Sequence, residues 1–202
     1  MSIFDKIVEW STVRGIIASK SVIGQVGKFN EEVGETQSAL VRSKLHNIKD
    51  GVGDALVIMT NVLAMEGYTP ERAINLNAVP RPSYANLHVN QIICGINYKW
   101  SGFFWEEAIA IAVDDLDDIA SDVVELLAEL ARRYEFTLAE ALDMVFAEIE
   151  PRVGIFYNET FIKQADFTDE LLTRIINDPE VTPEVRDFAE QQLVLLNAKK
   201  EA

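Results

Sequence analysis

Glycine and proline are scarce in this chain, and their scarcity restricts the fold more than any other feature of the sequence. The 202 residues include ten glycines and six prolines, too few for the many tight turns of a β-rich protein. Apolar residues recur at helical spacing, as in 3–18, and no stretch alternates apolar and polar residues strongly enough to demand a strand. The sequence therefore predicts an all-α protein, in which only 155–162 is a candidate for a short hairpin.

Capping and breaking residues give the limits of the expected helices. Thr137 and Glu140 have the spacing of a capping box, and Thr182-Pro183 has the pattern of a helix start. The pairs His46-Asn47 and Ser101-Gly102 are expected breaks, and Pro80 and Pro82 make 79–83 the clearest boundary. The expected helices cover 3–18, 21–43, 50–66, a stretch from 69, 84–99, 105–134, a stretch from 137 to about 150, 168–177 and 182–198.

Composition excludes several classes of protein. The chain is 49% hydrophobic and 25% charged, with a net charge of −15, so we expect a folded core and neither a nucleic acid polymer nor an anionic membrane as partner. A single cysteine, Cys94, excludes a disulfide within the chain. Residues 1–10 do not form a signal peptide, and the longest uncharged apolar run, 55–65, is too short to span a bilayer. We expect a soluble cytoplasmic protein.

The chain contains an approximate repeat. A shift of about 68 positions aligns Asp54 with Asp122, Thr69 with Thr137, and several apolar positions. Asp50 aligns with Asp118 in the same way. We interpret this as an internal duplication and predict three regions: a catalytic helical unit in 1–79, a second repeat in 80–166 and a C-terminal helical extension in 167–202.

The first group of candidate functional residues lies in 28–35. On a helix, Glu32 and Glu35 share one face because they are three residues apart. Lys28 lies on that face and Glu31 at its edge. Like charges this close repel each other unless a cation lies between them. A solvated acidic surface is the alternative interpretation, and it is the commoner one for an isolated Glu-Glu pair.

The next expected helix favours the functional interpretation. Asp50, Asp54 and Asn61 fall within about 40° of one another on a helix, while the rest of that helix is largely apolar. Antiparallel packing of the two helices would bring Glu32 and Glu35 opposite the two aspartates. Converging carboxylates of this kind are typical ligands of Mg²⁺ or Mn²⁺.

The run KFNEEVGE, followed by IKDGVGDALVIMTNVL, resembles the MazG-like nucleotide pyrophosphohydrolases, particularly their small bacterial and phage-borne members. That family carries EExxE on one helix, matched by Glu31, Glu32 and Glu35, and an acidic pair ending in aspartate on the next, matched by Asp54. The upstream pattern of Trp10, Ser11, Arg14 and Gly15 and the tail EIEPRVGIFYNETFIKQAD also resemble phage-type members.

The resemblance implies hydrolysis of a (deoxy)nucleoside triphosphate to the monophosphate and pyrophosphate, in the host cytoplasm if the chain is phage-encoded. It implies Mg²⁺ as cofactor, with Mn²⁺ as the alternative. The implied metal ligands are Glu32, Glu35, Asp50 and Asp54. Glu31 or Glu35 is the candidate to orient or deprotonate the attacking water. The candidate substrate-binding residues are Lys28, Lys49, Asn61, Arg152 and Lys163.

Two departures from the family pattern stand out. Gly51 occupies the place of the usual glutamate, so Asp50 is expected to substitute for it. Lys99, Trp100 and Phe103 stand where a second EExxE would lie. We therefore interpret the second repeat as a degenerate partner that completes a four-helix core, in an arrangement similar to the all-α dimeric dUTPases.

Several alternatives stay open. The chain is either a general pyrophosphohydrolase, an enzyme specific for dUTP or dCTP, or a non-catalytic nucleotide-binding protein on the same fold. His46 and His88 lack the Glu-x-x-His pattern of di-iron bundles. The aromatic residues of 100–105 are core by default, and a base-stacking wall or an oligomer interface otherwise. Apolar surface expected there and on 182–198 predicts a homodimer, with a monomer and then a tetramer as the next choices.

Overall fold

The computed structural model describes residues 1–107, 116–158 and 160–200, and these are mostly helical, which confirms the predicted all-α class. The α-helices are α1 (Ile3–Val13), α2 (Val22–Val41), α3 (Leu45–Met65), α4 (Pro70–Ala73), α5 (Val89–Glu107), α6 (Leu116–Arg133), α7 (Leu138–Ile149), α8 (Asp169–Asn177) and α9 (Pro183–Lys200). The remaining elements are the 3-10 helices η1 (Pro82–Asn86) and η2 (Gln164–Asp166) and the strands β1 (Gly154–Tyr157) and β2 (Thr160–Lys163). Within the described residues, no helix is both long and apolar enough to cross a membrane.

The chain forms two compact units. One unit contains Val22–Ile149, and the other joins the two ends of the chain, Met1–Ser21 and Glu150–Ala202. The predicted limit at 79/80 lies inside the first of these units, because α3 packs against α7 across it. The predicted limit at 166/167 lies inside the second, where Phe167 and Ile155 share one core.

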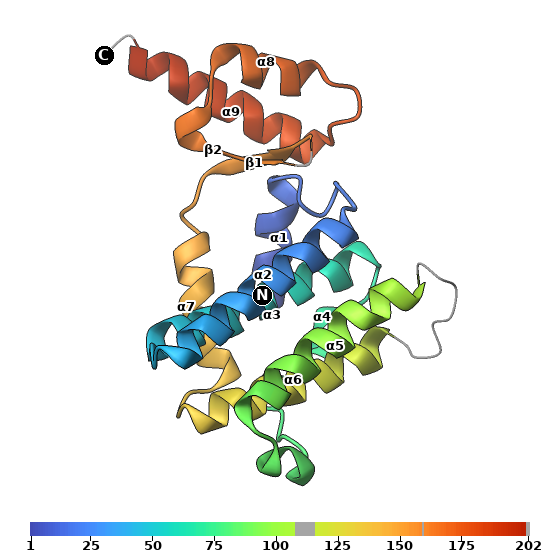
Figure 1. Ribbon diagram of the computed structural model, residues 1–202. Helices are drawn as coiled ribbons and strands as arrows, with labels where there is room; N and C mark the ends of the chain where they lie inside the picture. The colour runs from blue at the N-terminus through green and yellow to red at the C-terminus, as the bar shows by residue number, and fades with distance from the viewer. Residues whose placement is uncertain (108–115, 159, 201–202) are drawn as a thin grey trace. The chain divides into compact units, whose positions relative to one another are not determined.

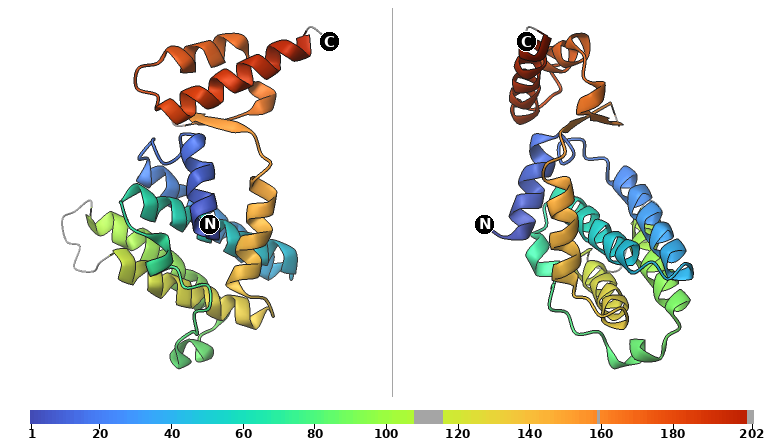
Figure 2. Two further views of the ribbon diagram at one scale, coloured as in Figure 1. Left: turned by 180° about the vertical axis from the view of Figure 1, so that it is seen from behind. Right: turned by 90° about the vertical axis from the view of Figure 1, so that its left-hand side faces the viewer.

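Two helical hairpins form the core of the unit 22–149. Helix α2 packs on α3, α5 packs on α6, and α2 also contacts α5. All four helices run along a similar direction (Figures 1 and 2). Their facing side chains, such as Phe29, Leu56 and Trp100, are fully buried. Burying these apolar faces against each other is the main source of stability for such helices.

Two pairs of helix limits are separated by 68 residues, the shift of the proposed repeat. Helix α3 ends at Met65 and α6 at Arg133, which are 68 residues apart, and α4 and α7 begin at Pro70 and Leu138, again 68 apart. The predicted capping box starts α7: the Glu140 amide donates to Thr137 Oγ1 (3.1 Å) and the Thr137 amide to Glu140 Oε2 (2.8 Å).

The unit made from the chain ends contains the predicted short hairpin, in which β1 and β2 pair antiparallel with Ile155 opposite Ile162. Helices α8 and α9 lie side by side (Figure 1). The backbone of Arg14 joins α1 to this hairpin, because its carbonyl accepts from the Phe156 amide at 2.7 Å. Gly15 follows with φ +81°, and a Cβ there would lie 2.9 Å from the Phe156 carbonyl oxygen. A side chain is therefore disfavoured at Gly15.

The two motifs at opposite ends of the chain meet in this unit. The Arg14 guanidinium donates to the Arg152 carbonyl at 2.8 and 3.2 Å and lies 4.3 Å from the Trp10 ring centroid. It also lies 5.5 Å from the Phe188 ring centroid. A guanidinium between two rings gains cation–π energy while its N–H groups stay bonded. The sequence pattern around Trp10 and Arg14 therefore has a structural role.

Several predicted helix limits are wrong, including the end of the expected helix 3–18, which stops at Val13, and the start of 84–99, which begins at Val89. Helix α3 begins at Leu45, so His46 and Asn47 form its first turn, and the break lies at Arg42–Lys44. Ser101 and Gly102 lie inside α5. Of the expected helix 105–134, α6 covers Leu116–Arg133, and 108–115 lie outside the described residues. Packing explains the continuity of α3 and α5, because buried neighbours such as Ile48 and Trp100 outweigh weak local propensity.

Trp100, Phe103 and Phe104 of α5 are core, as the default interpretation predicted, whereas Tyr98 on the same helix is exposed. Trp100 is fully buried, with its ring centroid 5.3 Å from that of Phe29 and 5.4 Å from that of Phe104. Phe103 is buried too, with its centroid 5.1 Å from that of Phe104. The apolar surface expected from these residues is therefore absent. The Trp105 side chain lies outside the described part of the molecule.

Candidate functional site

The candidate carboxylates lie on the first hairpin, where α2 and α3 approach most closely at Gly51. A Cβ at this position would overlap Thr36 Oγ1 and lie 3.2 Å from the Glu32 carbonyl oxygen. The Thr36 hydroxyl itself donates to the same carbonyl at 2.9 Å. This contact sets the register of the hairpin and brings the glutamates of α2 to the level of the aspartates of α3, as antiparallel packing predicted.

Glu32 is the most buried of the three glutamates, with 8% of its surface exposed. Its carboxylate accepts from Lys28 Nζ at 2.8 Å, and Lys28 also contacts Glu31 at 3.0 Å. Burial lowers the pKa of the Lys28 ammonium, but hydrogen bonds to Glu32 and Glu31 outweigh it, so this pKa lies above its usual value. Lys28 is therefore a charged partner that neutralises part of the negative charge of Glu31 and Glu32.

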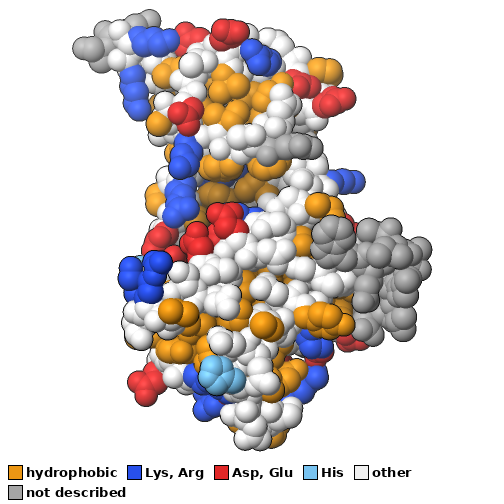
Figure 3. Space-filling view, in the orientation of Figure 1, with side chains coloured by type: hydrophobic (Ala, Val, Ile, Leu, Met, Phe, Trp, Pro, Cys, Tyr) orange, Lys and Arg blue, Asp and Glu red, His pale blue; other side chains and the backbone are white. Residues whose placement is uncertain are grey.

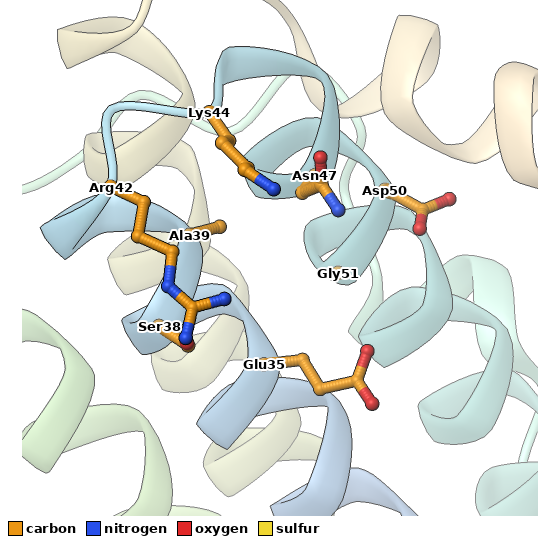
Figure 4. Close-up of a pocket in the computed structure, with 8 residues that line it drawn as sticks. All are labelled: Glu35, Ser38, Ala39, Arg42, Lys44, Asn47, Asp50 and Gly51. Atoms are coloured by element: carbon orange, nitrogen blue, oxygen red, sulfur yellow. The ribbon is translucent and has the colours of Figure 1, made fainter.

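Glu35 and Asp50 line a pocket of about 270 Å³ between the end of α2 and the start of α3. Arg42 and Lys44 lie on the opposite side of the pocket from the two carboxylates (Figure 4). Asn47, in the first turn of α3, lies between Lys44 and Asp50. The pocket thus offers two carboxylates, two cations and an amide around one small space.

The polar residues of the α3 stripe are less exposed than Glu31 and Glu35 of α2. Asp50 and Asp54 are partly buried, and Asn61 is only 3% exposed. The rest of the helix is core: Ala55 and Val62 are fully buried. The stripe is therefore a polar strip along an apolar helix, as the sequence predicted.

The chemistry of these side chains fits Mg²⁺ or Mn²⁺, which prefer carboxylate oxygens. In the described residues, no three Asp, Glu, His or Cys side chains lie close enough together to hold a metal ion. Glu32 is engaged by Lys28 instead. A metal at this hairpin would compete with Lys28 for the Glu32 carboxylate.

The remaining predicted substrate-binding residues do not line this pocket. The Lys49 ammonium lies 6.0 Å from the ring centroid of Phe136, which follows α6. Arg152 and Lys163 belong to the unit made from the chain ends, where both side chains are exposed. Their proposed contact with phosphate stays a prediction.

In the second hairpin, an aspartate of α6 pairs with two side-chain cations. Asp122, the repeat equivalent of Asp54, accepts from Lys99 Nζ at 2.6 Å and pairs with Arg81. Burial raises the pKa of the Asp122 carboxyl, but hydrogen bonds from Lys99 and Arg81 lower it further than burial raises it. Trp100 and Phe103, the equivalents of Glu32 and Glu35, are buried in the core. Lys99 and Arg81 thus both pair with Asp122, and Arg81 also pairs with Glu125 at 2.9 Å.

Sequence reasoning missed Arg42 and Lys44. The expected helix ran to 43 and the next began at 50, which placed both residues away from the acidic pair. Backbone bonds that no sequence pattern reports make the turn short: the Lys44 amide donates to the Ala39 carbonyl at 3.0 Å. Ser43 adopts a φ of 53°, a conformation in which glycine or asparagine would have been a clearer signal.

Acidic and basic side chains lie close together on the face of the molecule seen in Figure 3, so the net charge of −15 is not spread as a uniform negative layer. Comparison with protein-family models, with curated proteins and with solved structures found no match.

Proposed function

We propose that this chain is a metal-dependent nucleotide pyrophosphohydrolase that converts a (deoxy)nucleoside triphosphate to the monophosphate and pyrophosphate. The observation that carries the proposal is the pocket of the first hairpin, where Glu35 and Asp50 face Arg42 and Lys44. This pocket suits a phosphate chain bound to a divalent cation, because the carboxylates would bind the metal and the basic side chains would bind the phosphates.

Glu32, Glu35, Asp50 and Asp54 would hold Mg²⁺, or Mn²⁺ in its place. The bound metal would neutralise the phosphate chain and activate a water for attack. Glu35 is the better candidate to accept the proton from that water, since it lines the pocket, whereas Glu31 is paired with Lys28. Lys28, once released from Glu32, supplies a positive charge next to the site.

Two features support a common origin of the hairpins. Their second helices, α3 and α6, end 68 residues apart, and the degenerate hairpin keeps an aspartate where the first has Asp54. We therefore propose a duplicated core of the all-α nucleotide pyrophosphatase kind, resembling the MazG-like enzymes, in which the second hairpin completes the packing. We further propose that the protein is a homodimer.

The decisive experiment is an assay of pyrophosphate release from canonical and modified deoxynucleoside triphosphates with Mg²⁺. Glu35→Gln is expected to lower turnover by about 100-fold or more, the scale of losing a positioned catalytic group. Glu66→Gln, at an exposed position just after α3, serves as the control. Near-normal turnover in Glu35→Gln would overturn the assignment.

The same panel of substrates separates the alternatives. Cleavage of uridine or cytidine nucleotides alone would replace the general enzyme with a specific one. Nucleotide binding without release of pyrophosphate by the wild-type protein would show a binding protein instead.

A further inference from the structure

Arg42 and Lys44 are two cations whose position is fixed by the backbone of a three-residue turn. The Arg42 amide donates to the Ser38 and Ala39 carbonyls at 3.3 and 3.2 Å, and the Lys44 amide donates to the Ala39 carbonyl at 3.0 Å. These bonds close the last turn of α2 and lead directly into α3. The two cations therefore belong to an ordered turn, and both lie at the pocket.

These two side chains have no partner in the described part of the molecule. Neither Arg42 nor Lys44 makes a side-chain hydrogen bond or an ion pair there, although Glu35 lines the same pocket and is likewise unpaired. Elsewhere in this unit, facing charges do pair, as in the ion pairs of Arg81 and Lys99 with Asp122. The pocket thus separates opposite charges, as expected for a site that receives a ligand with both an anion and a metal cation.

The size and lining of the pocket suit the phosphate groups of a nucleotide and not its base. Its volume of about 270 Å³ lies just below the range of roughly 300–1,000 Å³ that is typical of whole small-molecule sites. A planar guanidinium binds two phosphate oxygens at once, and an ammonium adds a compact point charge. The lining offers no aromatic ring for a base: the residues that line it are Glu35, Ser38, Ala39, Arg42, Lys44, Asn47, Asp50 and Gly51.

We infer that Arg42 and Lys44 bind the pyrophosphate part of the substrate, which leaves in the reaction, while Glu35 and Asp50 face the metal that accompanies it. This inference rests on the proposed function and extends it. It divides the site into a phosphate pocket at the α2–α3 turn and a nucleoside site elsewhere. The turn then belongs to the binding machinery, and the two cations are required for affinity toward phosphate.

Isothermal titration of inorganic pyrophosphate into the full-length protein, with Mg²⁺ and separately with EDTA, tests the inference. Arg42→Gln and Lys44→Gln are each expected to weaken binding by about 10-fold, the scale of one lost charged hydrogen bond, and the double variant more. Arg72→Gln, at an exposed position on α4, should bind as the wild type does. With EDTA, wild-type binding should fall too, because the carboxylates then repel the anion.

Titration of a nucleoside monophosphate provides the second measurement. Its affinity should be the same in wild type and in both variants, since the monophosphate does not enter the pyrophosphate pocket. Unchanged pyrophosphate affinity in the double variant, no pyrophosphate binding by the wild type, or loss of monophosphate affinity instead would each overturn the inference.

The two proposals can fail separately. Suppose that the wild type releases no pyrophosphate from any triphosphate, and that the variants bind pyrophosphate more weakly than the wild type does. The proposed reaction is then wrong, and the assignment of the phosphate pocket is retained. If the wild type hydrolyses triphosphates while the double variant binds pyrophosphate normally, the reaction stands and the pocket assignment is wrong. Both side chains are exposed, and circular dichroism would confirm that the variants fold.

Discussion

Gly51 decides how closely the two helices of the candidate site approach. Its missing side chain leaves room for the Thr36 hydroxyl, and the Glu32 carbonyl lies just beyond. A glutamate here, as in the family that the sequence resembles, would have to push α2 away from α3. The departure from the family pattern therefore follows from the packing of the hairpin, and it leaves Asp50, next to the contact, as the acidic group on this turn of α3.

Gly51→Ala is predicted to destabilise the protein by about 1–3 kcal/mol, the usual cost of an added methyl group in a filled contact. Urea titration would measure the change in the free energy of unfolding. Gly34→Ala is the matched control, because a Cβ at Gly34, also on a helix, meets nothing within 4 Å. It should stabilise the protein by roughly 0.5–1 kcal/mol. Wild-type stability in Gly51→Ala would contradict the close approach.

The buried carboxylate of Glu129 predicts a dependence of stability on pH. Glu129 is 1% exposed and accepts from Arg132 at 2.8 and 2.9 Å and from Arg133 at 2.7 Å. Hydrogen bonds from Arg132, and then from Arg133, outweigh burial and hold the pKa of this carboxyl below its usual value. Since the folded pKa is lower than the unfolded one, this stabilisation is present above the unfolded pKa and is lost as pH falls through the folded pKa.

Glu129→Gln should therefore cost about 2 kcal/mol at neutral pH, the scale of hydrogen bonds to a charged group. The difference from wild type should shrink as pH falls below the ordinary range of a glutamate. Thermal unfolding of both proteins over a pH series would measure it. A difference that stays constant down to the lowest pH would argue against a role for the charge.

At the scale of elements, the two hairpins provide a matched pair of aspartates for mutation. Asp54 lies in the hairpin with the acidic pocket, while Asp122 is held between Lys99 and Arg81. Asp54→Asn is predicted to lower turnover by about 100-fold or more and to raise the Mg²⁺ concentration needed for half-maximal activity, because a metal ligand is lost.

Asp122→Asn should behave in the opposite way. It should keep the turnover and the Mg²⁺ requirement of the wild type but lose about 1–2 kcal/mol of stability, because Lys99 and Arg81 lose a charged partner. Pyrophosphate release and urea titration on both variants would decide. Loss of activity in Asp122→Asn without loss of stability would show that the second hairpin is also a metal site.

The sequence predicted much of the fold because helical periodicity and capping residues are local signals. Thr137 with Glu140 starts α7 as expected, and Thr182-Pro183 starts α9 as expected. The break at His46 was wrong because packing around Ile48 extends the helix past weak helix formers. The cations of the candidate pocket were missed because their place depends on the backbone bonds of one short turn.

At the scale of the whole molecule, the proposed homodimer would bury apolar side chains that are exposed in a single chain, although Trp100, Phe103 and Phe104 of α5 are not among them. Exposed large hydrophobic residues within the described part of the chain include Ile23, Val41, Leu45, Val79, Tyr98, Val194 and Leu195. Such side chains gain from burial when they form a contiguous surface. Light scattering should give about twice the chain mass of 22.7 kDa. A mass equal to that of one chain would contradict the prediction.

The unit built from both ends of the chain has a consequence for synthesis on the ribosome. Helix α1 is made before residues 22–149, yet its partners in β1 and α9 are made after them. Residues 22–149 are contiguous and can pack as soon as they have emerged, whereas Trp10 and Arg14 must wait for Arg152 and Phe188. The segment around Trp10 and Arg14 is therefore expected to become ordered only after residues 22–149 have been made.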